Sequence, residues 1–105
     1  MAGNVELASF FSTIADILDI RGDNAFRVRA YRNAARTIEG LAEPLTEIVA
    51  HTPERLEHLP GIGKGLHAKI IEYCQHGRLS EYDELTASIP AGLIELLNLP
   101  SFGPK

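Results

Sequence analysis

The chain has 105 residues and a formal net charge of −4, and 45% of its residues are hydrophobic. This size suits one domain with a modest core, and the acidic balance excludes a protein coated in basic charge but not a local basic face. No stretch approaches the roughly 20 apolar residues that span a membrane, the first residues do not resemble a signal peptide, and a single cysteine, Cys74, fits the reducing cytoplasm.

Two long helices are predicted at the start of the chain. Asn4 is typical of an N-cap for a helix over residues 5–20, whose acidic residues Asp16 and Asp19 would lie on a solvated face. Asp23 or Asn24 would cap a second helix over residues 25–41. Apolar spacing predicts that the first helix buries Leu7, Phe10, Phe11, Ile14, Ile17 and Leu18, and the second Phe26, Ala30, Ala34, Ile38 and Leu41.

The second helix carries a concentration of arginine. Five of the ten basic residues lie between positions 21 and 36, with Asp23 as the only acid among them. Arg29, Arg32 and Arg36 are spaced to share one helix face, and Tyr31 lies one turn after Arg27. The face could be solvated and paired with carboxylates, or it could contact phosphate. Because carboxylates are scarce within this helix, we favour phosphate.

A glycine-rich turn follows a short apolar segment at 44–50 and a short helix that begins at Thr52-Pro53-Glu54 and ends near residue 58. The turn reads Leu59-Pro60-Gly61-Ile62-Gly63-Lys64-Gly65 and leads into a helix over residues 64–76 that ends at Gly77. A glycine turn that opens a helix presents bare N–H groups to an anion, with Lys64 beside them. The stretch resembles a helix-hairpin-helix motif, which binds the DNA backbone without reading sequence; the alternative is a turn whose glycines serve packing alone.

The remaining chain completes an all-α prediction. Ser80, with Asp83 at capping-box spacing, would cap a helix over residues 81–88 whose outer face carries Glu81, Asp83 and Glu84. A short helix is expected at 92–99, and residues 99–105 repeat the Leu-Pro-x-x-Gly pattern as the start of a second, truncated hairpin. We predict a small helical bundle with one complete hairpin at 56–77, and the end of the sequence inside a second hairpin suggests a fragment of a longer protein.

Residues 26–36, the hairpin, Gly77-Arg78-Leu79 and the closing Leu-Pro-x-x-Gly-Pro-Lys together resemble the N-terminal domain of family X DNA polymerases. The bacterial PolX members, which are similar to polymerase beta, match best, over essentially all of residues 1–105. The resemblance implies a single domain that binds the 5′-phosphate side of gapped or nicked DNA in base excision repair. It also implies polymerase and PHP domains elsewhere in a longer chain, no membrane, and a location in the bacterial cytoplasm at the nucleoid.

The resemblance also assigns residues. The family's Schiff-base lysine, which removes 5′-deoxyribose phosphate, falls on Lys69, and the aromatic residue of its phosphate pocket falls on Tyr31. A basic pocket residue falls on Arg27, whereas two others fall on Gly65 and Glu81, which weakens the expected pocket. Backbone carbonyls that hold a monovalent cation, Na⁺ or K⁺, fall on Glu57, Leu59 and Ile62. The residues expected to contact DNA or phosphate are Arg27, Arg29, Tyr31, Arg32, Gly61, Gly63, Lys64 and Gly65.

Three functions are therefore open from sequence. The first is a DNA-binding module without sequence preference, and the second is a 5′-deoxyribose phosphate lyase acting through Lys69. The third is a helical module for protein interaction, which the acidic first and later helices would suit. No polymerase activity is expected, because the polymerase metal site of the family lies in a later domain.

Overall fold

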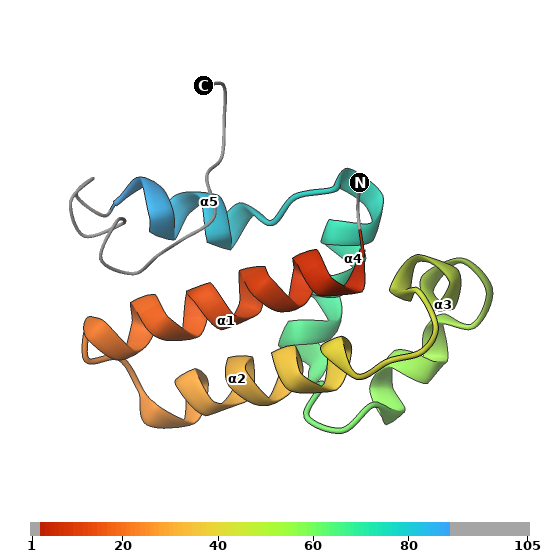
Figure 1. The fold of residues 1–105 in the computed structure, drawn as a ribbon, viewed down its shortest axis with the longest axis horizontal. Coiled ribbons are helices and arrows are strands. Elements are labelled where there is room, and N and C mark those ends of the chain that lie inside the picture. The colour runs from red at the N-terminus through yellow and green to blue at the C-terminus, as the bar shows by residue number, and fades with distance from the viewer. Residues whose placement is uncertain (1–2, 89–105) are drawn as a thin grey trace.

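The computed structural model describes residues 3–88, and helices are the regular secondary structure of this part of the chain, as predicted. Figure 1 shows α1 lying between α5 on one side and α2 on the other. The helices are α1 (Asn4–Ile20), α2 (Ala25–Glu39), α3 (Leu45–His51), the 3₁₀-helix η1 (Pro53–His58), α4 (Lys64–His76) and α5 (Ser80–Ala87). None of the helices within 3–88 is both long and apolar enough to cross a membrane.

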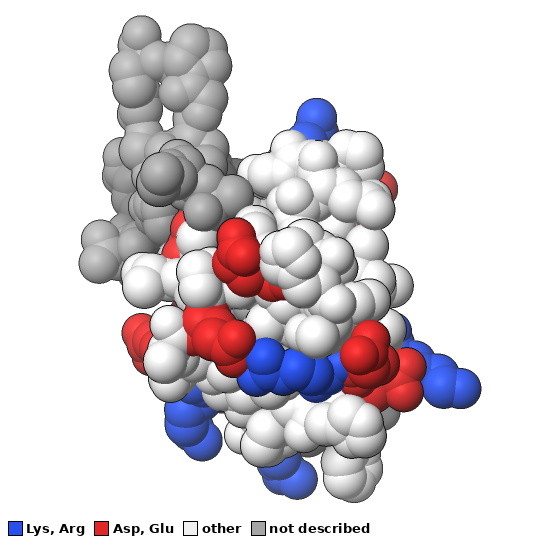
Figure 2. All heavy atoms as spheres, turned by 90° about the vertical axis from the view of Figure 1, so that its right-hand side faces the viewer, with Lys and Arg blue, Asp and Glu red and all other residues white. Residues whose placement is uncertain are grey.

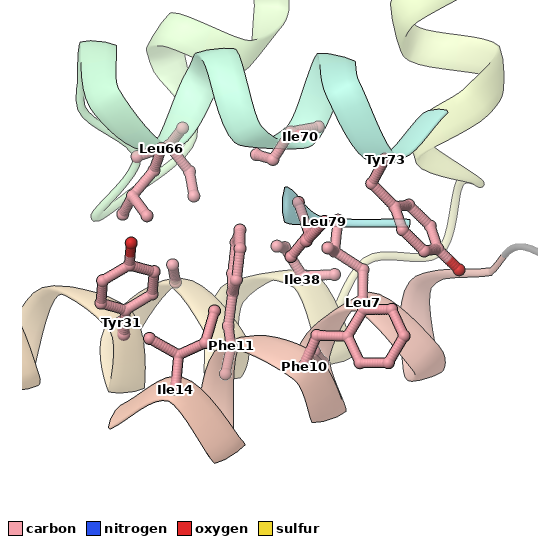
Figure 3. Packing of buried hydrophobic residues seen from close by; sticks show 14 of the residues in the cluster. Leu7, Phe10, Phe11, Ile14, Tyr31, Ile38, Leu66, Ile70, Tyr73 and Leu79 are labelled. Carbon is pink, nitrogen blue, oxygen red and sulfur yellow. The ribbon is translucent and has the colours of Figure 1, made fainter. Parts of the chain in front are cut away.

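The core forms where α1, α2 and α4 meet. All six apolar residues predicted for the first helix are buried, because their spacing places them on the face toward α2 and α4. Figure 3 shows Leu66, Ile70 and Tyr73 of α4 pointing toward α1 and α2. Phe11 meets the Tyr31 ring edge to face at 5.5 Å, and Phe10 meets Tyr73 at 5.8 Å. The core therefore holds the second hairpin helix against the α1–α2 pair.

The hairpin between η1 and α4 is fixed on α2 by close backbone contact. Gly61 has φ +79°, a conformation that side chains disfavour, and a Cβ there would lie 3.4 Å from Cβ of Asn33. The Thr37 hydroxyl donates to the carbonyl of Pro60 at 2.8 Å. Leu56 and Ile62 are buried on either side of the turn. The backbone conformation and the close approach to α2 thus explain why glycine occupies this position of the turn.

The buried face of α2 differs from the predicted one. Phe26 is 76% exposed, and the residues that are buried are Val28, Tyr31, Ala34, Ala35 and Ile38. Ala30 and Leu41 are only partly buried, and the helix ends at Glu39 instead of residue 41. Phe26 lies in the first turn of α2 on a side that does not face the core, whereas Val28 and Tyr31 belong to the buried cluster.

Two predicted caps are wrong. Gly3 is the N-cap of α1, and the side chain of Asn4 instead accepts from the amide of Leu45, the first residue of α3, at 2.8 Å. Leu79 is the N-cap of α5, while the amide of Ser80 donates to the carboxylate of Glu72 at 3.0 Å. Asn24 caps α2 as expected, accepting from the amide of Phe26. In both wrong cases a tertiary partner took the polar group that local sequence assigned to a cap.

Two elements expected from sequence, the helix at 92–99 and the second hairpin at 99–105, lie outside the described residues.

The observed buried face of α2 predicts that truncating two of its apolar side chains changes the free energy of unfolding by different amounts. Ile38→Ala should lower the free energy of unfolding by about 2–5 kcal/mol, because its side chain is fully buried. Phe26→Ala should change it by no more than about 0.5 kcal/mol, since this ring is exposed. Urea denaturation of the two variants measures both effects, and equal losses would contradict the observed register of α2.

Candidate nucleic-acid interface

The start of α4 has an open backbone. Gly63 is the N-cap with φ −91° and ψ −177°, and no side chain caps the helix. A Cβ built on Gly63 or Gly65 would meet nothing within 4 Å. Lys64 is exposed and forms no ion pair within residues 3–88. The first amides of α4, the positive end of its dipole and one free ammonium group are therefore available to an anion.

The arginine face of α2 is less free than predicted. Arg32 contacts two carboxylates of α1, Asp16 at 2.9 Å and Asp19 at 3.6 Å. These acids keep contact with solvent, as expected, with side chains 39% and 68% exposed, but they also pair with an arginine of the neighbouring helix. Arg29 lies over the Phe26 ring, 5.7 Å from its centroid. Phosphate contact by Arg29 and Arg32 stays a prediction.

Acidic partners also sit beside basic residues elsewhere on the surface. Arg55 of η1 donates to both carboxylate oxygens of Glu43, and its hydrogen bonds hold the pKa of Glu43 below the ordinary value. Figure 2 shows the face on the right-hand side of Figure 1, where basic side chains are bordered by acidic ones. The local basic face that the sequence suggested is therefore broken into smaller areas.

Three of the predicted pocket residues converge on a fourth that was predicted to face outward. The hydroxyl of Tyr31 donates to Oε1 of Glu81. The ammonium group of Lys69 donates to the same oxygen, with Nζ at 2.9 Å from it. The guanidinium of Arg27 donates to Oε2 of the same carboxylate. We call these four residues the Glu81 cluster. The prediction that Glu81 lies on the outer face of its helix is wrong, since its side chain is only 16% exposed.

Local backbone structure explains why Glu81 reaches this position. Gly77 ends α4 in the left-handed conformation, with φ +72°, and lets the chain turn back toward α1. Leu79 and Tyr82 are then buried, and the Tyr82 ring stacks on Phe10 at 4.5 Å. With these two side chains fixed in the core, the first turn of α5 lies over Lys69, and Glu81 points toward it.

The cluster stabilises the charged form of its carboxylate. Burial alone would raise the pKa of Glu81, but hydrogen bonds from Tyr31 and Lys69 and the charges of Lys69 and Arg27 hold it below the ordinary value of 4.5. Burial and the hydrogen bond to Glu81 raise the pKa of Tyr31, so its hydroxyl stays protonated. Asp23 contacts Arg27 at 3.4 Å. Two cations thus face two carboxylates, and the local formal charge is zero.

Apart from Arg29 and Arg32, which lie elsewhere on α2, the predicted site residues fall into two groups. Arg27, Tyr31 and Lys69 meet in the Glu81 cluster, and Gly65 lies one turn before Lys69 on the same side of α4. The second group consists of the hairpin residues Glu57, Leu59, Gly61, Ile62, Gly63 and Lys64, which lie before and at the start of that helix. What sequence reasoning missed is the inward position of Glu81, although Leu85, four residues later on the same side of α5, packs against the core and was a signal for it.

Comparison with known proteins agrees with this geometry. A family model described as a helix-hairpin-helix domain matches residues 2–79. The chain belongs to the helix-hairpin-helix domain family. It is also 36% identical, over 100 residues, to the DNA polymerase/3′-5′ exonuclease PolX of Bacillus subtilis (strain 168). That alignment covers 95% of this chain and 17% of the PolX protein. The recognition of a PolX-type helix-hairpin-helix domain is confirmed.

Because of the hydrogen bond between Tyr31 and Glu81, we predict that Tyr31→Phe lowers the free energy of unfolding by an amount that depends on pH. Because the folded-state pKa of Glu81 lies below its ordinary value, the stabilisation by this bond is complete above pH 4.5 and is lost as the pH falls through the folded-state value. Tyr31→Phe should lower the free energy of unfolding by about 1 kcal/mol near neutral pH, and less in acid. Denaturation over a pH series tests this, and carboxyl NMR should show the pKa of Glu81 rising in the variant. A loss that is the same at every pH would contradict the assignment.

Proposed function

We propose that this domain binds the phosphate backbone of DNA without reading base sequence, as part of a longer polymerase of the PolX type. The observation that carries the proposal is the uncapped start of α4, with Gly63 and Gly65 open to solvent and Lys64 unpaired within the described residues. Backbone amides at a helix start bind phosphate, and contacts to phosphate carry no sequence information. The match to a DNA polymerase over nearly the whole chain supports the same function.

We further propose that the preferred site is the 5′-phosphate side of a gap or nick, which would suit base excision repair. The support is that Arg27, Tyr31 and Lys69 meet at one place, since an arginine, a lysine and a hydroxyl are the groups that hold a terminal phosphate. The polymerase and PHP domains of a longer chain and a cytoplasmic, nucleoid-associated location follow from this function and stay predictions.

A monovalent cation at the hairpin is part of the same proposal. The resemblance to family X polymerases makes the backbone carbonyls of Glu57, Leu59 and Ile62 the candidate ligands. Uncharged carbonyl oxygens suit Na⁺ or K⁺. The Leu59 carbonyl accepts from the amide of Ile62 at 3.1 Å and keeps a second lone pair for an ion. A cation held there would bridge the hairpin to a DNA phosphate.

Binding to DNA should depend on the charge of Lys64 at the hairpin. Lys64→Ala should weaken binding to labelled one-nucleotide-gap DNA and lower the slope of log affinity against log salt by about one, since one phosphate contact is lost. Arg78→Ala is the matched control, because it removes the same charge at the other end of α4. If the wild type binds no gapped DNA at low salt, or if both variants bind equally, the hairpin is not the interface.

Binding should also depend on the open backbone at Gly63. Gly63→Ala places a methyl group where DNA phosphate would approach, although the added Cβ contacts nothing within the protein. We expect weaker DNA binding with a free energy of unfolding within about 0.5 kcal/mol of the wild type. Gly40→Ala, at the end of α2, is the control for the same chemical change. Undiminished DNA binding by Gly63→Ala would contradict the proposed approach to the α4 amides.

A second candidate function is the lyase reaction, favoured by the position of Lys69 beside Tyr31 and Arg27. The amine would form an imine with the C1′ aldehyde of a deoxyribose phosphate and release water. The nucleophile must be a free amine, whereas in the structure Nζ of Lys69 lies 2.9 Å from Oε1 of Glu81 in an ion pair. Any lyase activity therefore requires Lys69 to leave this carboxylate.

Borohydride trapping tests the lyase reaction. An abasic, 5′-incised DNA strand should give a covalent adduct with the wild type and none with Lys69→Ala. Arg78→Ala again serves as the control for lost charge. No adduct with the wild type would exclude the activity, and an adduct that persists in Lys69→Ala would assign it to another amine.

A further inference from the structure

The Glu81 cluster has the ligand chemistry of an anion site that is already filled. A guanidinium, an ammonium group and a tyrosine hydroxyl all donate to one carboxylate. The same donors bind phosphate oxygens, and arginine in particular recognises carboxylate and phosphate through the same geometry. The carboxylate of Glu81 is an anion that belongs to the protein, whereas the phosphate of a DNA end would be an anion from a ligand.

The two cationic donors are more exposed than the carboxylate that they contact, whereas Tyr31 is buried. The side chains of Arg27 and Lys69 are 46% and 29% exposed, compared with 16% for Glu81. A phosphate could therefore approach the cations from outside. While Glu81 and Asp23 stay in place the local charge sums to zero, so an arriving phosphate gains no net attraction and meets a carboxylate at close range.

We propose that Glu81 is an internal anion that competes with the 5′-phosphate of DNA for the three donors of the cluster. This inference rests on the proposed function. In the resting domain the carboxylate holds the donors, and a terminal phosphate binds them only when the carboxylate leaves. Glu81 thereby sets how strongly the domain prefers a phosphorylated end to a hydroxyl end. Binding through the hairpin amides and Lys64 does not involve this competition.

Displacing the carboxylate does not require α5 to unfold. Leu79 and Tyr82 are buried on either side of Glu81 and hold the first turn of the helix in the core. The carboxylate of Glu81 contacts Tyr31, Arg27 and Lys69, which belong to other helices. A rotation of its side chain toward solvent is therefore enough to free the donors, and its position in the first turn of α5 keeps a carboxylate favourable near that helix start.

The test compares two variants that lose one negative charge each. Glu81→Gln removes the charge of the competing carboxylate, and Asp83→Asn removes a charge from the same helix that pairs with Arg78, outside the cluster. For each variant and the wild type, dissociation constants are measured for one-nucleotide-gap DNA with a 5′-phosphate and with a 5′-hydroxyl. Thermal denaturation of each protein verifies folding.

The inference predicts that Glu81→Gln raises the preference for the phosphorylated gap by roughly tenfold, as expected for one additional charge-assisted hydrogen bond to the phosphate. Asp83→Asn should leave the preference unchanged. An unchanged preference in Glu81→Gln, or equal tightening in both variants on both DNAs, would overturn the competition while leaving the DNA-binding function intact. Failure of every protein to bind either DNA would overturn the proposed function itself.

A measurement on the wild type covers the case in which Glu81→Gln does not fold. The probe is a short 5′-phosphorylated single-stranded oligonucleotide, and the readout is the carbon NMR signal of the Glu81 carboxyl group. Displacement predicts that the signal moves as the oligonucleotide is added and that the same oligonucleotide with a 5′-hydroxyl moves it less. A signal that stays fixed while the phosphate signal of the oligonucleotide shows binding would overturn the inference.

Discussion

The exposed backbone of the hairpin depends on the burial of its apolar side chains. Leu56, Ile62 and Leu66 are buried around the turn, and the positive φ of Gly61 lets the chain lie directly on α2. Apolar contacts of this kind fix the turn without using its amides. The start of α4 is therefore rigidly placed while its polar groups remain unpaired by side chains. A side-chain cap on the first turn of α4 would occupy amides that are otherwise open to an anion.

Many acidic side chains of this protein pair with basic ones and so reduce its local positive charge. Aspartates of α1 contact Arg32, Glu43 contacts Arg55, and Glu81 contacts both Arg27 and Lys69. Exposed pairs of this kind add little to stability, but each lowers the local positive charge seen by a polyanion. Attraction to a DNA backbone is then concentrated where a cation is left without a partner, and Lys64 at the hairpin is such a position within residues 3–88. A moderate and salt-sensitive affinity is the physical consequence.

The fold could be predicted because its signals are local and tertiary packing did not override them. These signals are the apolar periodicity of the first helix and the turns at Gly22, Gly61 and Gly77. Prediction failed where an alternative register or partner was available. Phe26 fitted the predicted stripe, but the core buried Val28 and Tyr31 instead. The resemblance to family X polymerases pointed to Arg27, Tyr31 and Lys69, which meet in the Glu81 cluster, yet it treated Glu81 only as a lost basic position. The spacing to Leu85 places Glu81 on the inner side of α5, but the contact with Arg27 and Lys69 depends on Leu79 and Tyr82, whose burial docks this helix.

The same packing separates the position of Glu81 from the interactions it makes. Tyr82 stacks on Phe10, so α5 is docked by apolar contact whether or not the carboxylate is bound. The bonds from Glu81 to Arg27 of α2 and Lys69 of α4 join elements that the core already holds together. Loss of these bonds therefore changes the charge of the pocket much more than the stability of the fold. In the competition that we propose, a ligand displaces the carboxylate while Tyr82 keeps α5 docked, and one carboxylate thereby governs phosphate binding.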